Sequence, residues 1–166
     1  MICPVCQSDN LPGSDECENC GADLRSLDLP SPATPFEARL LEERLTELEP
    51  RRPIAVAPTD PATRAIAVMQ EHRVGCVVVE DGGRLVGILT ERDALLKLAG
   101  RPLEGIAVRD VMTPDPVVLR VDDTIAVAIH KMAVGGFRHI PLVRDGRVTA
   151  IVSARDLTHH LVELLG

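Results

Sequence analysis

Four cysteines near the start of the chain have the types and the spacing of metal ligands. They form two Cys-x-x-Cys pairs, made of Cys3, Cys6, Cys17 and Cys20. Each pair lets two sulfurs converge within one tight turn, and two pairs complete the tetrahedron that Zn²⁺ prefers. A redox site would need only one such pair. We therefore expect residues 1–24 to hold a structural Zn²⁺ ion, with iron in a rubredoxin-like site as the open alternative.

The cysteine segment is acidic. Residues 1–24 have no lysine or arginine, and they carry the five carboxylates of Asp9, Asp15, Glu16, Glu18 and Asp23. With four thiolates and one Zn²⁺, the lobe would have a net charge of −7, so nucleic-acid phosphates would repel it. We expect either a protein-docking element or a small folded cap. Docking is favoured because residues 25–35 contain three prolines and are typical of an extended linker.

The composition of the whole chain indicates a folded protein that does not bind nucleic acid. The 166 residues are 45% hydrophobic, which suffices for a core, but that core must be aliphatic because there are two Phe and no Trp or Tyr. The net charge of −7 and the lack of stacking aromatics weigh against nucleic-acid binding. No apolar run has the length of a membrane span. No secretory signal follows Met1, so we expect a cytoplasmic protein with reduced cysteines.

The remainder of the chain repeats itself with a shift of 63 positions. Without a gap, the shift places Pro53 on Pro116, Asp60 on Asp123, Met69 on Met132 and Arg92-Asp93 on Arg155-Asp156. Such a match indicates two copies of one structural unit. An amphipathic segment precedes the copies, residues 36–49, where apolar spacing predicts one helix over 36–48. This helix would either cover a face of the body or join a dimer interface.

Each copy has the pattern of a β-α-β-β-α unit. The predicted elements are a strand (54–57; 117–120), a helix (61–73; 124–134), a hairpin with an Asp-Gly turn (76–89; 139–152) and a last helix (91–99; 154–164). A unit of about 60 residues buries a core poorly by itself. We therefore expect an α+β fold in which two units, related by a pseudo-twofold axis, share one core.

Particular stretches resemble a known family. GILTERDALL (87–96) resembles the end of a CBS repeat, AIVSARDLTH (150–159) is its second copy, and residues 112–143 resemble the front half. The pair is similar to a Bateman module, with repeats at 50–105 and 106–166. CPVC…CENCGADL is similar to short zinc ribbons.

The resemblance implies a regulatory role. Bateman modules bind adenosine-containing ligands such as AMP, ADP, ATP or S-adenosylmethionine between their repeats, form homodimers and control a protein partner. The resemblance places Asp93 and Asp156 at a ribose, and Thr90 and Ser153 near a phosphate.

The residues themselves leave two roles open for these motifs. Ser/Thr-x-x-Asp at a strand-to-helix junction presents a helix N-terminus, which attracts anions, but the same pattern is a capping box that only fastens the helix. The copies differ nearby, since Arg138-His139 replaces Gly75-Cys76. We therefore expect two unequal sites, with phosphate near Arg138 and His139 and with Arg92 and Arg155 flanking. The candidate aliphatic walls for adenine are Ile54, Val56, Val77, Ile140 and Pro141, and we expect most of them to be core residues whether or not a ligand binds.

Other function classes are less favoured. No Ser/His/Asp or Cys/His pattern indicates a nucleophile, and a four-thiolate metal site has no open position, so we do not expect an enzyme. A structural adaptor with empty clefts stays an alternative. A DNA-binding regulator is a weaker one because of the acidic charge.

Overall fold

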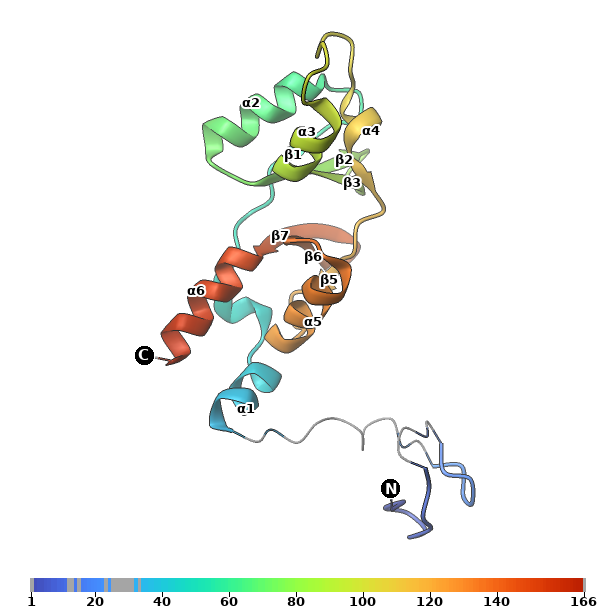
Figure 1. Ribbon diagram of the computed structural model, residues 1–166. Helices are drawn as coiled ribbons and strands as arrows, with labels where there is room; N and C mark the ends of the chain where they lie inside the picture. The colour runs from blue at the N-terminus through green and yellow to red at the C-terminus, as the bar shows by residue number, and fades with distance from the viewer. Residues whose placement is uncertain are drawn as a thin grey trace. The chain divides into compact units, whose positions relative to one another are not determined.

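The computed structural model describes residues 2–11, 14, 16–22, 24, 32 and 34–165. The chain divides into two compact units, residues 1–38 and 39–166 (Figure 1). The first unit contains the cysteine segment. The second contains both copies of the repeat, and it positions the candidate ligand-binding residues. Among the described residues, no helix is both long and apolar enough to cross a bilayer.

The single helix predicted over 36–48 is instead two pieces. Helix α1 spans Pro35–Glu42 and the short 3-10 helix η1 spans Leu45–Leu48. Between them the backbone bonds to the second repeat: Ile125 N–H donates to the Glu43 carbonyl over 3.0 Å, and Leu45 N–H donates to the Asp123 carbonyl over 2.9 Å. These long-range hydrogen bonds replace the helical ones, and periodicity alone does not show them.

The predicted β-α-β-β-α order is confirmed in both copies. The first repeat contains β1 (Ala55–Val56), α2 (Ala62–His72), β2 (Cys76–Asp81), β3 (Arg84–Thr90) and α3 (Glu91–Leu98). The second contains β5 (Leu119–Arg120), α5 (Ile125–Gly135), β6 (His139–Arg144), β7 (Arg147–Ser153) and α6 (Ala154–Leu165). Two short elements that the sequence did not predict connect them, α4 (Val108–Val111) and β4 (Thr113–Pro114).

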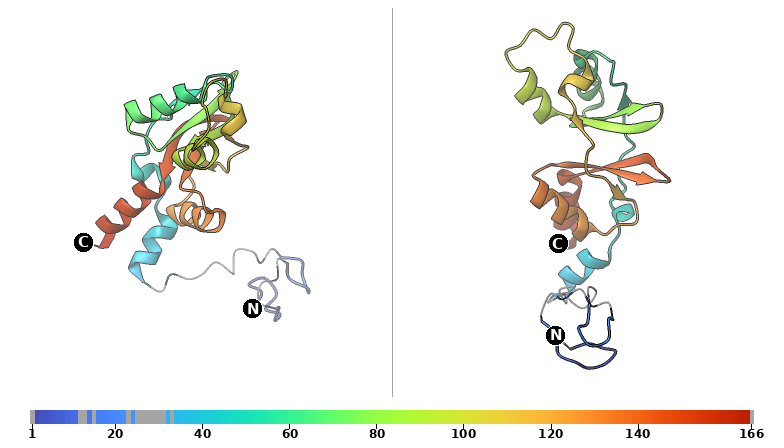
Figure 2. Two further views of the ribbon diagram at one scale, coloured as in Figure 1. Left: turned by 45° about the horizontal axis from the view of Figure 1, so that its top comes forward. Right: turned by 90° about the vertical axis from the view of Figure 1, so that its right-hand side faces the viewer.

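The strands form two small sheets that face each other. The first has the order β1-β2-β3-β4 and the second β5-β6-β7, with the first strand of each repeat parallel to its neighbour and the hairpin strands antiparallel. Both hairpins have an irregularity at equivalent places, after Val79 and after Leu142. In Figure 2 the helices of each repeat lie on the outer side of its own sheet. The fold is therefore α+β with pseudo-twofold related repeats, as predicted.

The prediction of one shared core is wrong, because each repeat has its own. Val77 and Val79 of β2 pack with the helices of the first repeat, while Ile140 and Leu142 of β6 pack with those of the second. A thin third cluster of Cys76, Val78, Ile88 and Ile151 lies between the sheets. Successive strand residues point to opposite faces. In β2, Val77 and Val79 therefore face the core of the first repeat, while Cys76 and Val78 face the second sheet.

The segment that leads into each repeat packs on the other repeat. Leu45 is fully buried in the core of the second repeat, and Val108, 63 residues later, is fully buried in the core of the first. The first lead-in continues along the second sheet, where Ile151 N–H donates to the Arg51 carbonyl over 2.9 Å. This exchange places Arg51 and Arg52, which precede β1, beside residues of the second repeat.

Candidate functional sites

The four cysteines predicted as metal ligands lie together in the first unit. Their sulfurs all lie within 4.8 Å of one another, with 3.6 Å between Cys3 and Cys20 and 3.6 Å between Cys6 and Cys17. A tetrahedral ion with Zn–S bonds of 2.3 Å separates its sulfurs by about 3.8 Å. The cluster therefore fits a four-thiolate metal site in donor type, number and spacing.

Each Cys-x-x-Cys pair closes in the same way. Gln7 N–H donates to the Cys3 carbonyl over 2.9 Å, and Gly21 N–H donates to the Cys17 carbonyl over 2.8 Å. Gln7 and Gly21 both have positive φ, 62° and 70°, which turns the chain back after the second cysteine of each pair. The two turns point all four sulfurs at one place.

Ser8 is a part of this site that sequence reasoning missed. Its hydroxyl lies 2.9 Å from the sulfur of Cys6 and 3.2 Å from that of Cys17. Hydrogen bonding from Ser8 is the largest cause that lowers the pKa of Cys17 to about 5 and the pKa of Cys6 to about 7. Thiolates are the form that binds metals, so Ser8 favours ligation. A serine two residues after a cysteine is too common to signal this role.

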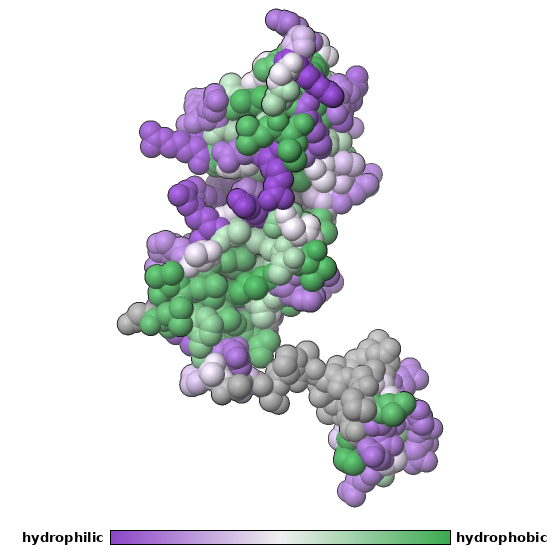
Figure 3. All heavy atoms as spheres, viewed as in Figure 1, coloured by the Kyte–Doolittle hydropathy of each residue, from purple (hydrophilic) through white to green (hydrophobic). Residues whose placement is uncertain are grey.

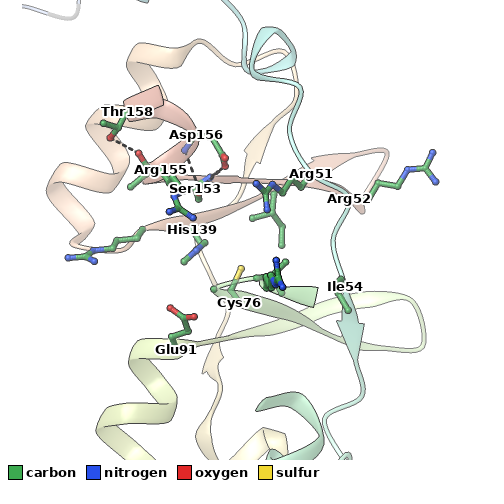
Figure 4. A pocket seen from close by; sticks show the side chains of 16 residues that line it. Arg51, Arg52, Ile54, Cys76, Glu91, His139, Ser153, Arg155, Asp156 and Thr158 are labelled. Carbon is green, nitrogen blue, oxygen red and sulfur yellow. Dashed lines mark hydrogen bonds between the residues drawn. The ribbon is translucent and has the colours of Figure 1, made fainter. Parts of the chain in front are cut away.

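Two cavities lie between the repeats in the second unit. The larger, about 520 Å³, includes Ser153 and Asp156 and is named the Asp156 cavity; the other, about 410 Å³, includes Thr90 and Asp93 and is named the Asp93 cavity. They are related by the repeat, since Ile54 of the first corresponds to Val117 of the second. In Figure 3, hydrophilic side chains gather where the two repeats meet. In Figure 4, Glu91 and Cys76 face His139 and Ser153 across the Asp156 cavity.

Both Ser/Thr-x-x-Asp motifs form capping boxes. Thr90 Oγ1 accepts from Asp93 N–H over 3.2 Å while an Asp93 carboxylate oxygen accepts from Thr90 N–H over 3.1 Å. Ser153 and Asp156 form the same pair of bonds over 3.3 and 2.8 Å. The capping role is therefore present in both copies. In each carboxylate the oxygen Oδ2 accepts the capping hydrogen bond. The oxygen Oδ1 is therefore the atom whose contacts decide whether a ligand hydroxyl could be bound.

The two carboxylates differ at that remaining oxygen. Asp93 Oδ1 lies 2.8 Å from the ammonium of Lys97 and accepts from Thr113 Oγ1 over 3.0 Å. Within the described part of the chain, Oδ1 of Asp156 has no protein partner. Burial raises the pKa of Asp93, but hydrogen bonds from Lys97, Thr90 and Thr113 outweigh it and the net shift is downward. Asp156 is thus ready to accept from a ligand hydroxyl, whereas Asp93 is already engaged.

The basic side chains predicted at the sites also differ in their use. Arg92 donates to the carbonyl of Gly136 over 2.8 Å and so joins the two repeats. Its counterpart Arg155 has no protein partner among the described residues. Arg138 and His139 line both cavities. A methyl group on Gly75 would lie 2.9 Å from His139 Nε2, so the glycine makes room for this ring. Burial foremost lowers the pKa of His139, which favours the neutral imidazole.

Of the candidate apolar walls, Ile54 lines the Asp156 cavity. As expected for most of them, Val56, Val77 and Ile140 are residues of the repeat cores, and Pro141 is also buried. Ile151 also lines the Asp156 cavity. The Asp93 cavity is lined by three apolar residues that sequence reasoning missed, Ile88, Val117 and Phe137. Shifting Ile54 by the repeat length finds Val117, so that signal was available.

Three arginines in the Asp156 cavity were also missed. Arg51, Arg52 and Arg73 line it although they lie outside the quoted motifs. Arg51 and Arg52 reach the cavity only because the lead-in segment packs on the second repeat. For Arg73 a signal existed, since an arginine occupies the position of Gly136 in the other copy.

The model of the CBS domain family matches this chain twice, over residues 45–100 and 108–163. The two matches begin at the buried anchors Leu45 and Val108. One similar protein is the CBS domain-containing protein CBSCBSPB3 of Arabidopsis thaliana, 35% identical over 113 residues that make up 66% of this chain. The match spans only 20% of that plant protein.

Solved structures agree with the fold. The crystal structure of the CBS domain NE2398 is 27% identical, covers 71% of this chain and 94% of its own, and has a TM-score of 0.67. The CBS domain pair of the protein MJ0100, solved with 5'-methylthioadenosine and S-adenosyl-L-methionine, is 22% identical, covers 70% of this chain and 98% of its own, and has a TM-score of 0.63. The chain therefore belongs to the CBS domain family, and it carries two consecutive copies of that regulatory domain.

Proposed function

We propose that the chain is a non-catalytic regulatory module that binds an adenosine-containing ligand between its two repeats. The observation that carries this proposal is the Asp156 cavity. It combines a carboxylate oxygen that has no partner among the described residues, several arginines and the apolar side chains of Ile54 and Ile151. These groups match a ribose hydroxyl, a phosphate and a purine respectively. The ligand pair held by MJ0100, which shares the fold, is of the same adenosine class.

The proposed roles follow the chemistry of each side chain. Asp156 accepts from a ribose hydroxyl, and Ser153 lies near the phosphate at the helix N-terminus. Arg138, His139 and Arg155 hold the phosphate tail. In the second site Asp93, Thr90 and Arg92 would have equivalent roles, but their present hydrogen bonds would have to be exchanged for ligand contacts.

Regulation would come from differential binding. The Asp156 cavity is lined by residues of the lead-in segment, of the first repeat and of the junction between β7 and α6. A ligand that touches all three favours one packing of the repeats over others, and it can shift the equilibrium only by its difference in affinity for them. The module would pass this state to a protein partner. We further propose a homodimer in the cytoplasm, with the zinc knuckle as a structural or docking element.

A structural adaptor with empty cavities is the second candidate. It is favoured by the completeness of both capping boxes, because helix capping alone accounts for both Ser/Thr-x-x-Asp motifs. A DNA-binding regulator is less favoured because of the acidic cysteine segment.

Thermal unfolding of the zinc-loaded protein separates these candidates. AMP, ADP, ATP and S-adenosylmethionine are added one at a time to the wild type and to Asp156→Ala. A ligand at a hundredfold excess over its Kd stabilises the folded state by about 2.7 kcal/mol. We expect a rise in melting temperature for the wild type that Asp156→Ala removes. If none of the four compounds raises it, the adaptor is the better description.

A further inference from the structure

The two cavities carry opposite charge. Five arginines line the Asp156 cavity beside two carboxylates, a formal charge of +3: Arg51, Arg52, Arg73, Arg138 and Arg155 against Glu91 and Asp156. The Asp93 cavity has two arginines and three carboxylates, a formal charge of −1: Arg92 and Arg138 against Glu91, Asp93 and Asp115. Since Arg138 and Glu91 are common to both, the difference comes from the remaining side chains.

The excess charge is a departure from the repeat. Arg51 and Arg52 correspond to Pro114 and Asp115 in the second copy. The position of Arg52 is therefore basic in the Asp156 cavity, and its equivalent, Asp115, is acidic in the Asp93 cavity. Arg73 corresponds to Gly136. Both end their helices in the left-handed region, with φ of 52° and 67°. That conformation suits glycine and is costly for arginine. Even so, Arg73 occupies it and places a cation at the Asp156 cavity.

The arginines of the Asp156 cavity are available to a ligand. Within the described part of the chain, none of the five guanidinium groups has a protein acceptor, whereas Arg92 of the other cavity is bonded to Gly136. In Figure 4 Arg51 projects between the repeats, whereas the side chain of Arg52 lies at the edge of the cavity and points away from the other lining residues. A ligand with several negative oxygens can accept hydrogen bonds from these guanidinium groups and offset the formal charge of +3 on the cavity lining.

We propose that the Asp156 cavity accepts a ligand with two or more adjacent phosphates and that the Asp93 cavity excludes it, so that each chain binds one polyphosphate. The nucleoside part of the ligand rests on the proposed function, while the polyphosphate part rests on the arginines alone. The Asp93 cavity, with its net negative charge and its engaged carboxylate, is left to an uncharged or cationic compound.

Calorimetric titration of the full zinc-loaded chain at 0.1 M salt tests this. The probes are adenosine, AMP, ADP, ATP and inorganic tripolyphosphate. We expect affinity to increase about tenfold with each added phosphate, one ATP per chain, and competition by tripolyphosphate. Affinity should also fall as salt is raised.

Variants locate the charge. Arg73→Gly introduces the residue that the other repeat has at this backbone position, so it should fold at least as well as the wild type. It should bind ATP about tenfold more weakly and adenosine unchanged, as should Arg51→Ala. The control is Arg84→Ala, at the start of β3 and outside both cavities, with unchanged ATP affinity. Asp115→Arg should allow a second ATP to bind.

The outcomes distinguish this proposal from the proposed function. Equal affinities for adenosine, AMP and ATP would overturn the polyphosphate assignment and leave adenosine recognition intact. Binding of tripolyphosphate without binding of any adenosine compound would support the polyphosphate assignment and remove the proposed function. Two ATP per chain in the wild type would overturn the exclusion from the Asp93 cavity. No binding of any probe would overturn both proposals.

Discussion

Asp93 and Thr113 are joined by a hydrogen bond of 3.0 Å that fastens the connection between the repeats to helix α3. Asp93 also accepts from Thr90, and it pairs with Lys97, whose ammonium in turn donates to the carbonyls of Val111 and Met112 over 2.8 and 3.2 Å. This network holds α4 and β4 in place. Among the described residues, the only bonds of Asp156, its counterpart 63 residues later, are those with Ser153.

Replacement of the two aspartates should therefore affect stability unequally. Asp93→Ala removes a cap and two further contacts of a carboxylate that is 13% exposed, and we expect a loss of about 3 kcal/mol in the free energy of unfolding. Asp156→Ala removes the cap alone and should cost about 1 kcal/mol. Urea unfolding of both variants without ligand measures this. Equal losses would mean that Thr113 and Lys97 contribute nothing through Asp93.

Leu45 should be a strong anchor although it belongs to the segment before β1 and packs in the other repeat. It is fully buried in the core of the second repeat, and Leu45→Ala should cost about 3 kcal/mol through the lost burial and the cavity left behind. Leu41, in the same apolar pattern but 37% exposed, is the matched control, and Leu41→Ala should cost less than about 1 kcal/mol. Similar losses for both variants in urea unfolding would contradict this role for η1.

The sequence predicts the elements well because the repeat shows each pattern twice. The two apolar runs of CVVVEDGGRLVGIL and the Asp-Gly turn between them define the first hairpin, and the second copy shows the same pattern and pairing. The spacing of Cys3, Cys6, Cys17 and Cys20 likewise predicts the cluster, because it is a local property of two tight turns.

The sequence predicts the partners of these elements poorly. Whether Val77 or Cys76 faces the neighbouring repeat depends on how two sheets stack, and the continuous apolar run of β2 does not distinguish its two faces. Arg51 reaches the Asp156 cavity because a lead-in segment crosses to the other repeat, which no local pattern encodes. The division of the helix at Glu43 also depends on hydrogen bonds to residues about eighty positions away.

Glu43 should make stability depend on pH in the acidic range. Its carboxylate lies 2.6 Å from Nε2 of His160 and pairs with Arg39, and the side chain is 19% exposed. The hydrogen bond with His160 is the largest cause that lowers the pKa of Glu43 below its ordinary value of 4.5. A lowered pKa means that this stabilisation is present above about pH 4.5 and is lost as pH falls through the folded-state value.

Glu43→Gln should therefore destabilise the protein at neutral pH by about 1 kcal/mol, and the difference from the wild type should shrink as the pH falls below 4.5. Thermal unfolding from about pH 7 down to about pH 2, a series that extends well below the ordinary pKa of a glutamate, measures it. Glu163→Gln is the control, since its pair with His159 is exposed and should contribute little. A constant difference at all pH values would show that the Glu43 charge is not involved.

Removal of the metal should unfold the cysteine cluster and spare the repeats. Among the described residues of this segment the buried apolar ones are Cys3, Cys17 and Leu24, and small metal domains with so little core unfold without their ion. We expect one zinc per chain by elemental analysis, no zinc in Cys17→Ser, and an unchanged unfolding transition of residues 39–166 in either case. Iron in place of zinc would show as visible thiolate-to-iron absorption.

Thiol titration gives a second readout. After chelation four thiols should react, while Cys76, whose pKa burial foremost raises to about 12, should react only after the repeats unfold. Reaction of all five thiols upon chelation would show that the repeats depend on the metal.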